Sequence, residues 1–185
     1  MAHATTLRHS ALAFALTAGL AAPALAANPR VGGAPMFENK TIVENAVNSK
    51  DHTTLVAAVQ AAGLVETLSG PGPFTVFAPT NAAFAKLPPG TVENLVKPEN
   101  KATLTKVLTY HVVPGRYTSK ELTALAKQAG GQAELKTAEG STLAVMLKGG
   151  KLYVGDNKGN TARITTANVI QSNGVIHVID KVEMP

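Results

Sequence analysis

Apolar residues in the first part of the chain recur with the spacing of helices. Thr41 and Glu44 have the spacing of a capping box, which predicts a helix start at residue 41. A second helix is predicted to end at Gly63, a residue suited to a left-handed C-cap. The apolar face of this second helix consists of Leu55, Val56, Val59 and Ala62.

The middle of the chain alternates short extended and helical patterns. Residues 74–78 form a short apolar run bounded by prolines, which predicts a buried strand. Thr80 and Asn81 follow and offer an N-cap for a short helix that ends near Phe84. Residues 110–113 switch to extended chain before a Pro-Gly turn. Further helices are expected at residues 92–96, after Asn100 and at residues 121–126.

From residue 132 onward the pattern is that of strands. Residues 142–147 alternate apolar and polar positions, and Gly149-Gly150 predicts a two-residue turn. Asn173-Gly174 is the strongest hairpin signal of the chain. Helices concentrated before a run of antiparallel strands predict an α+β fold rather than a doubly wound α/β fold. The expected strands are at residues 142–147, 152–154, 163–165, 169–171 and 175–179.

The first 26 residues have the pattern of a secretory signal peptide. Arg8 lies in a weakly basic start, and residues 10–22 are apolar without a charge. Ala24-Leu25-Ala26 then supplies a small-x-small cleavage site, which places the mature start at Ala27. The alternative is an uncleaved membrane anchor, but the apolar stretch is short for a bilayer. We therefore expect export, either to the medium or to a periplasm.

The remaining chain is expected to form one domain. Residues 27–40 are rich in glycine and proline and predict a flexible leader, followed by a folded domain at residues 41–185. The chain has no cysteine. Disulfides, thiol nucleophiles and cysteine-ligated metals are thereby excluded, so stability must come from packing.

Charge and aromatic content limit the classes of partner. The formal net charge is +5, but the lysines and arginines are scattered. Only 4% of residues are aromatic and none is tryptophan, which disfavours nucleic-acid binding. A positive charge is compatible with an anionic polysaccharide as partner. No later segment is apolar enough to cross a membrane, so no membrane insertion is expected after signal cleavage. The oligomeric state has no sequence signal.

No catalytic or metal-binding pattern is present. The serines lack a Gly-x-Ser-x-Gly elbow, and no glycine-rich phosphate loop occurs. His52, His111 and His177 lie far apart in the sequence, without metal-ligand spacing. A stretch that begins at Asp156 resembles a calcium loop but has Ala167 where the closing carboxylate would stand. The sequence predicts a non-enzymatic protein without catalytic residues, metal or cofactor.

Three segments together resemble the motifs of the fasciclin-like domain family. They are Thr75–Phe84 (TVFAPTNAAF), Tyr110–Gly115 (YHVVPG) and Asn173–Val182 (NGVIHVIDKV). Their order and spacing also match, and the resemblance covers roughly residues 41–185. It implies a β-sandwich or wedge of short strands with several helices packed on one side. It further implies an exported binding module for cell adhesion or for contact with a matrix or envelope.

The resemblance also implies candidate site residues. In animal members the tyrosine-histidine segment is linked to integrin binding, which makes Tyr110 and His111 candidates for partner contact. The alternative is that both are structural, since buried polar groups are normally paired within the fold. His177 is interpreted as structural by the same rule, and Thr80 and Asn81 as a helix cap. We expect His111 to be at least half buried and tied to the Thr80-Asn81 region or to a nearby backbone group.

Two partner classes follow for the domain. The first is a cell-surface or matrix protein, or an anionic polysaccharide, as expected of an adhesion module. The second is an apolar small molecule, because some fasciclin-like proteins hold pigments and a mixed fold can enclose an apolar cleft.

Overall fold

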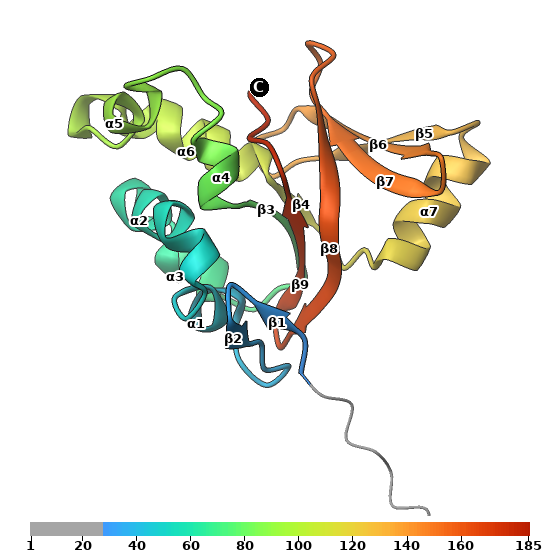
Figure 1. The fold of residues 1–185 in the computed structure, drawn as a ribbon, viewed down its shortest axis with the longest axis horizontal. Coiled ribbons are helices and arrows are strands. Elements are labelled where there is room, and N and C mark those ends of the chain that lie inside the picture. The colour runs from blue at the N-terminus through green and yellow to red at the C-terminus, as the bar shows by residue number, and fades with distance from the viewer. Residues whose placement is uncertain (1–27) are drawn as a thin grey trace, which may run out of the picture.

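A computed structural model describes residues 28–185 of the protein. The signal peptide expected at residues 1–26 lies outside the described residues. The described part is built on a seven-stranded sheet with the order β4-β3-β9-β8-β7-β6-β5 (Figure 1). Neighbouring strands are antiparallel except for the pair β3 and β9, which is parallel. The strands are β3 (Phe74–Pro79), β4 (Val112–Pro114), β5 (Gln132–Lys136), β6 (Thr142–Lys148), β7 (Lys151–Gly155), β8 (Thr161–Gln171) and β9 (Gly174–Ile179).

Helices lie on both sides of this sheet. Six of them gather beside β3 and β9, whereas α7 (Ser119–Gln128) packs against β5, β6 and β7 (Figure 1). The six are α1 (Ile42–Ala46), α2 (Thr53–Ala62), α3 (Val65–Ser69), α4 (Asn81–Phe84), α5 (Thr91–Leu95) and α6 (Lys101–Tyr110). Two 3₁₀ turns, η1 (Lys50–His52) and η2 (Pro98–Asn100), precede α2 and α6.

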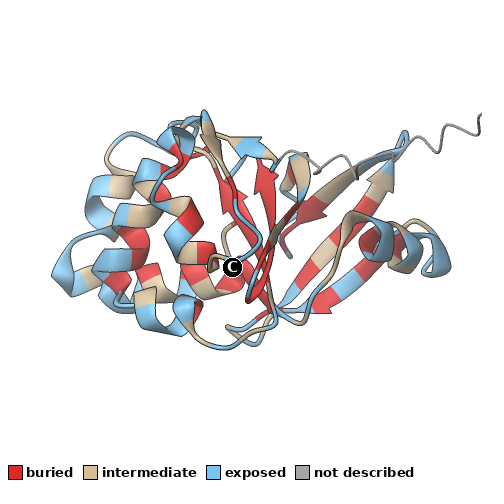
Figure 2. Cartoon of the chain, turned by 90° about the horizontal axis from the view of Figure 1, so that it is seen from below, coloured by how far each residue is buried: buried red, intermediate tan, exposed pale blue. Residues whose placement is uncertain are grey.

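Alternation along β3 divides the apolar core in two. Val76 and Ala78 face the cluster under α1–α6, while Phe77 faces the cluster under α7. Successive side chains of a strand point to opposite faces, so one buried strand serves both cores. Buried positions accordingly form stripes on the inner sides of the helices and along both faces of the central strands (Figure 2). The predicted α+β class, with most helices on one side of the strands, is confirmed.

The local helix signals read from the sequence are also confirmed. Thr41 and Glu44 form a capping box at the start of α1. Gly63 ends α2 with φ 73°, a left-handed conformation that costs glycine little. The Thr80 hydroxyl accepts a hydrogen bond from the Ala83 N–H and caps α4.

Residues 28–40 differ from the flexible leader that the sequence predicts. They form a hairpin and continue into the core, where Met36 is only 2% exposed. The glycines that indicated flexibility shape the tight turn, with φ 57° at Gly32 and 79° at Gly33. The prediction of a flexible leader is therefore wrong for residues 28–40, because their apolar side chains have a core to enter. The hairpin strands are β1 (Arg30–Val31) and β2 (Ala34–Pro35).

The last hairpin is also arranged differently from the expectation. The strands predicted at 163–165 and 169–171 are parts of one strand, β8, interrupted by bulges. Asn168 lies at this irregularity with φ 59°. The turn into β9 consists of Ser172 and Asn173, and Gly174 already pairs within the sheet. A Cβ at Gly174 would collide with the carbonyl oxygen of Phe74, so a close strand approach requires this glycine.

Candidate functional site

Tyr110 and His111 lie at the junction where α6 ends and β4 begins. Both are buried: Tyr110 is 0% exposed and His111 is 3% exposed. The Tyr110 hydroxyl donates to the carbonyl oxygen of Thr142 at 2.9 Å. Burial raises the pKa of Tyr110 to about 12. Neither side chain offers a surface to a partner in this conformation.

Both ring nitrogens of His111 are used inside the fold. Nδ1 lies 2.8 Å from the Val107 carbonyl oxygen, and Nε2 lies 3.1 Å from the backbone nitrogen of Glu183. The N–H of Glu183 donates to Nε2, so Nδ1 carries the proton and donates to Val107. Burial lowers the pKa of His111 to about 4, so the ring is neutral at physiological pH. The expected burial is confirmed, and the ties are to two backbone groups rather than to Thr80 or Asn81.

His177 is held in the same manner on β9. Its side chain is 0% exposed and stacks on the Phe77 ring, with 5.7 Å between the ring centroids. Nε2 donates to the Tyr117 carbonyl oxygen at 2.7 Å, and Nδ1 accepts from the Asn168 N–H at 3.4 Å. His177 thus fixes the left-handed Asn168 of the β8 bulge. These contacts favour the structural role that the sequence predicts.

Asn81 has a role different from the one expected of it. Its side chain accepts from the Thr54 N–H at 3.0 Å and donates to the Lys50 carbonyl oxygen at 2.9 Å. Thr80 alone caps α4, and Asn81 joins the start of α4 to the turn that carries His52. Sequence reasoning missed this link because it connects two segments that are 31 residues apart.

The sequence did not indicate that the Asn173 side chain forms hydrogen bonds with three backbone groups. Its Oδ1 accepts from the Ile42 N–H at 3.0 Å, and its Nδ2 donates to the carbonyl oxygens of Leu68 and Gly70. The Asn-Gly dipeptide was a turn signal only. Its place in the third motif segment was the one available sign of a further role.

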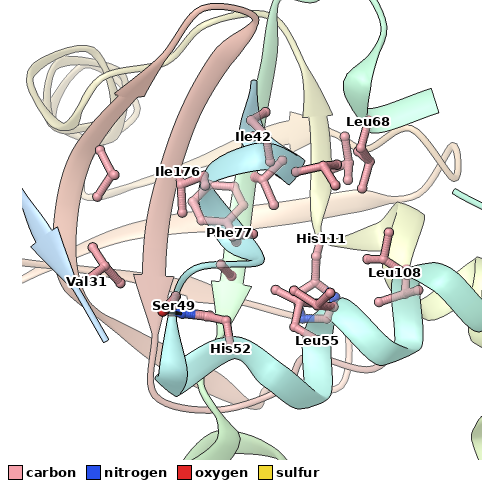
Figure 3. Close-up of a pocket in the computed structure, with 18 of the residues that line it drawn as sticks. Val31, Ile42, Ser49, His52, Leu55, Leu68, Phe77, Leu108, His111 and Ile176 are labelled. Carbon is pink, nitrogen blue, oxygen red and sulfur yellow. Dashed lines mark hydrogen bonds between the residues drawn. The ribbon is translucent and has the colours of Figure 1, made fainter. Parts of the chain in front are cut away.

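An apolar cavity of about 60 Å³ lies between α1, α2, α3 and the strands β3 and β9 (Figure 3). Its walls are formed almost entirely by aliphatic side chains from segments distant in the sequence. Four polar side chains also line it: Ser49, His52, Gln60 and His111. Because Gln60 is exposed and His111 is fully paired, Ser49 and His52 are the buried polar pair with unused capacity. Aliphatic residues of the wall include Val31, Ile42, Leu55, Leu68, Leu108 and Ile176.

His52 is buried at this wall with one nitrogen unpaired. The side chain is 3% exposed, and its Nδ1 lies 2.8 Å from the Ser49 hydroxyl oxygen. Within the described residues no group forms a hydrogen bond with Nε2. Burial lowers the pKa of His52, and the backbone of Ala78 and the charge of Asp51 oppose this shift in part. Burial thus favours the neutral ring, and Nε2 has no hydrogen-bond partner within the described residues.

Glu183 is a second buried group without a full set of partners. It is 1% exposed, and neither carboxyl oxygen forms a hydrogen bond within residues 28–185. Burial raises the pKa of Glu183 to about 7, and the charge of Asp156 adds to this effect. The carboxyl group is thus mostly protonated below neutral pH.

The described residues contain no group of three or more His, Cys, Asp or Glu side chains that could hold a metal ion. The Asp156 carboxylate accepts from the backbone N–H groups of Lys158 and Asn160, both at 2.9 Å. It closes the turn between β7 and β8. Over the same part of the chain, no helix is both long and apolar enough to cross a membrane.

Comparison with known proteins places this architecture in a family. The model of the Fasciclin domain matches residues 50–185. The chain is 53% identical over 145 residues to Protein sll1483 of Synechocystis sp., covering 78% of this chain and 73% of that protein. It is 38% identical to Immunogenic protein MPB70 of Mycobacterium bovis, over 76% of this chain and 66% of that one.

A solved structure has a similar fold. A FAS1 domain pair from the insect cell adhesion molecule fasciclin I superposes with a TM-score of 0.69 at 20% identity. The match covers 77% of this chain and 50% of that two-domain chain. The protein belongs to the Fasciclin domain family, and the resemblance seen in its three motif segments is confirmed.

Proposed function

We propose that the protein is an exported, non-enzymatic binding module that contacts a cell-surface, envelope or matrix component. The observation that supports this most is the match of nearly the whole described fold to a domain of an insect cell adhesion molecule. The signal-peptide pattern of residues 1–26 supplies the route to the outside. The candidate partners are a surface or matrix protein and an anionic polysaccharide.

In this proposal Tyr110 and His111 act through the fold. Since their polar atoms are engaged by Thr142, Val107 and Glu183, they hold the α6-to-β4 junction in place. A substitution at His111 then weakens partner binding only to the extent that it unfolds the domain. Binding loss without a change in the melting temperature would make the pair a contact site instead.

Capture from the native envelope or medium, with identification of the retained component, tests the adhesion proposal. Cells that lack the protein should also attach or aggregate less, and restored export should reverse this. The leaderless chain, which starts at Ala27 and stays inside the cell, is the control. Unchanged attachment, together with purified protein that retains no envelope or matrix component, would contradict the proposal.

The polysaccharide alternative has a direct test on the surface. Lys97 and Lys101 are exposed near the start of α6, and Lys148 and Lys151 are exposed at the β6–β7 hairpin. Retention on an immobilised acidic polysaccharide should fall with added salt, because salt screens exposed charges. Replacing either pair by glutamine removes the same charge, so the two double variants are matched controls. Equal loss would indicate unspecific attraction, and unequal loss would locate the surface.

A second candidate function is a carrier of an apolar small molecule, favoured by the aliphatic cavity between α1–α3 and the sheet. Protein purified from its native host should then contain an extractable apolar compound. Absorbance spectra and mass spectrometry of the solvent extract would detect it. A protein without extractable ligand that also binds no apolar probe would contradict this function.

A further inference from the structure

The cavity under α1–α3 has mostly aliphatic walls, and one polar atom of its lining is buried without a hydrogen-bond partner. His52 is 3% exposed, and no group in residues 28–185 pairs with its Nε2. His111 lines the same cavity, but both of its nitrogens are paired. Burying a polar group without a partner is unfavourable, so most such groups in folded proteins are paired. The exception at His52 therefore points to a partner from outside the chain.

We propose that the cavity binds an uncharged molecule that has an apolar body and a hydroxyl group, with the hydroxyl paired to Nε2 of His52. This inference rests on the second candidate function, the apolar carrier, and specifies the chemistry of its ligand. The aliphatic walls supply the apolar contact, and His52 supplies the single polar anchor (Figure 3).

The Ser49–His52 pair explains why a hydroxyl group fits. If the Ser49 hydroxyl donates to Nδ1, Nε2 carries a proton and donates to the ligand; with the opposite tautomer, Nε2 accepts. A hydroxyl group both donates and accepts, so it satisfies either tautomer. A hydrocarbon satisfies neither and leaves the nitrogen unpaired.

The walls also explain why the ligand is uncharged. No lysine or arginine is among the residues that line the cavity. Burial lowers the pKa of His52 and so disfavours a positive charge on its ring. A carboxylate would lose its hydration here without gaining a cation, which is strongly unfavourable.

The size of the cavity indicates which end of the ligand enters it. A volume of about 60 Å³ holds only one end of a lipid-like molecule. His52 is buried, whereas Val43, Val56 and Val65 on α1, α2 and α3 are partly exposed at the wall. The hydroxyl end therefore enters first, and the apolar body follows between these three helices.

Binding of three six-carbon probes to the full chain tests this assignment. The probes are 1-hexanol, hexane and hexanoate, followed by NMR titration. We expect 1-hexanol to bind about tenfold more tightly than hexane, the factor that one hydrogen bond supplies. Hexanoate should bind more weakly than 1-hexanol. The ¹⁵N resonance of His52 Nε2 should shift with 1-hexanol and not with hexane, a readout that needs no variant.

Two variants locate the anchor. His52→Phe should bind 1-hexanol and hexane equally, while the control Gln60→Leu, at the exposed polar residue of the wall, should keep the preference for the alcohol. Loss of the preference in Gln60→Leu, or tighter binding of hexanoate, would overturn the assignment. Equal binding of 1-hexanol and hexane by the unaltered protein would overturn the anchor and leave the carrier function standing. No binding of any probe would overturn both.

Discussion

We call the core under α7 closed because its leucines are fully buried and its buried tyrosine and histidine are paired, and we call the core under α1–α3 hollow because it contains a cavity. On the α7 side, Leu143 and Leu122 are 0% exposed, and the polar atoms of Tyr110 and His177 are paired inside the protein. On the other side, aliphatic walls surround a cavity of about 60 Å³ and a histidine with a free nitrogen. The two faces of one sheet therefore carry different cores, and only the core under α1–α3 contains the cavity described above.

The same contrast exists between two histidines of the cavity wall. His111 and His52 are each 3% exposed, and burial lowers the pKa of both. His111 uses both nitrogens, and His52 uses one. Burial and pKa alone thus do not separate a structural histidine from a candidate ligand contact. The count of hydrogen-bond partners does.

Truncation of one leucine in each core is the strongest test of this difference. Leu143→Ala in the closed core should lower the free energy of unfolding by about 2–5 kcal/mol. Leu55→Ala at the cavity wall should fall at the lower end of that range, because side chains beside a void make fewer contacts. Urea denaturation of both variants measures the losses. Equal losses would mean that the two cores are packed alike.

Identical substitutions at the two histidines give the next largest effect. His111→Phe leaves the Glu183 N–H and the Val107 carbonyl buried without a partner, at a cost of about 1–3 kcal/mol for each unsatisfied group. His52→Phe removes an unpaired nitrogen and separates only Ser49 from its partner, so its cost should be under about 1 kcal/mol. Thermal melts of both variants decide. A larger loss for His52→Phe would show that Nε2 has a partner in solution.

Glu183 and His111 should change the stability of the protein with pH in opposite directions. Glu183 has a pKa of about 7 in the folded protein, against an ordinary value of 4.5. Its contribution to the stability of the fold is therefore present below pH 4.5 and is lost as pH rises through 7. His111 has a folded pKa of about 4 against 6.5, so its contribution is present above pH 6.5 and is lost as pH falls through 4.

Glu183→Gln isolates the first of these effects. Asp156, Asp180 and Lys181 act on this carboxyl in addition to its burial. The variant should lose less stability than the unaltered protein between pH 5 and pH 8, because it has no carboxyl group to ionise. Denaturation midpoints measured across this range provide the comparison. Parallel curves for the two proteins would show that Glu183 has an ordinary pKa.

The smallest predicted effects concern the helix caps on the two sides of the sheet. Thr80 caps α4 on the hollow side, and Thr118 caps α7 on the closed side through a capping box with Glu121. Alanine at either position should cost about 1 kcal/mol, since each loses one side-chain cap. The cost is local and should not differ between the cores. Loss of hexanol binding in Thr80→Ala alone would link α4 to the cavity through Asn81.

Much of the fold could be predicted because its signals are local. The capping box at Thr41, the left-handed Gly63 and the apolar run of β3 each depend on a few neighbouring residues. The leader was wrongly predicted because Gly32 and Gly33 were taken as signs of flexibility, whereas Met36 beyond them enters the core. Glycine in a tight turn and glycine in a mobile segment have the same local pattern.

Only some residues of the candidate site could be predicted from the sequence. The motif segments drew attention to His111 and His177, and a general rule of pairing predicted that they are structural. His52 lies in no motif segment, and nothing around it differs from an ordinary helix start. Asn81 and Asn173 were noticed for caps and turns, yet they join segments 31 and 131 residues away.

The sequence by itself determined the α+β class, most helix starts and ends, and the family, because each follows from short patterns or from motif order. Tertiary structure alone decided that Met36 is core, which backbone groups pair with His111, and that Nε2 of His52 is unpaired beside an apolar cavity. The physical reason is that hydrogen-bond satisfaction and voids are properties of the three-dimensional neighbourhood. A histidine has the same donors and acceptors in every sequence, and only the packed chain determines which of them find a partner.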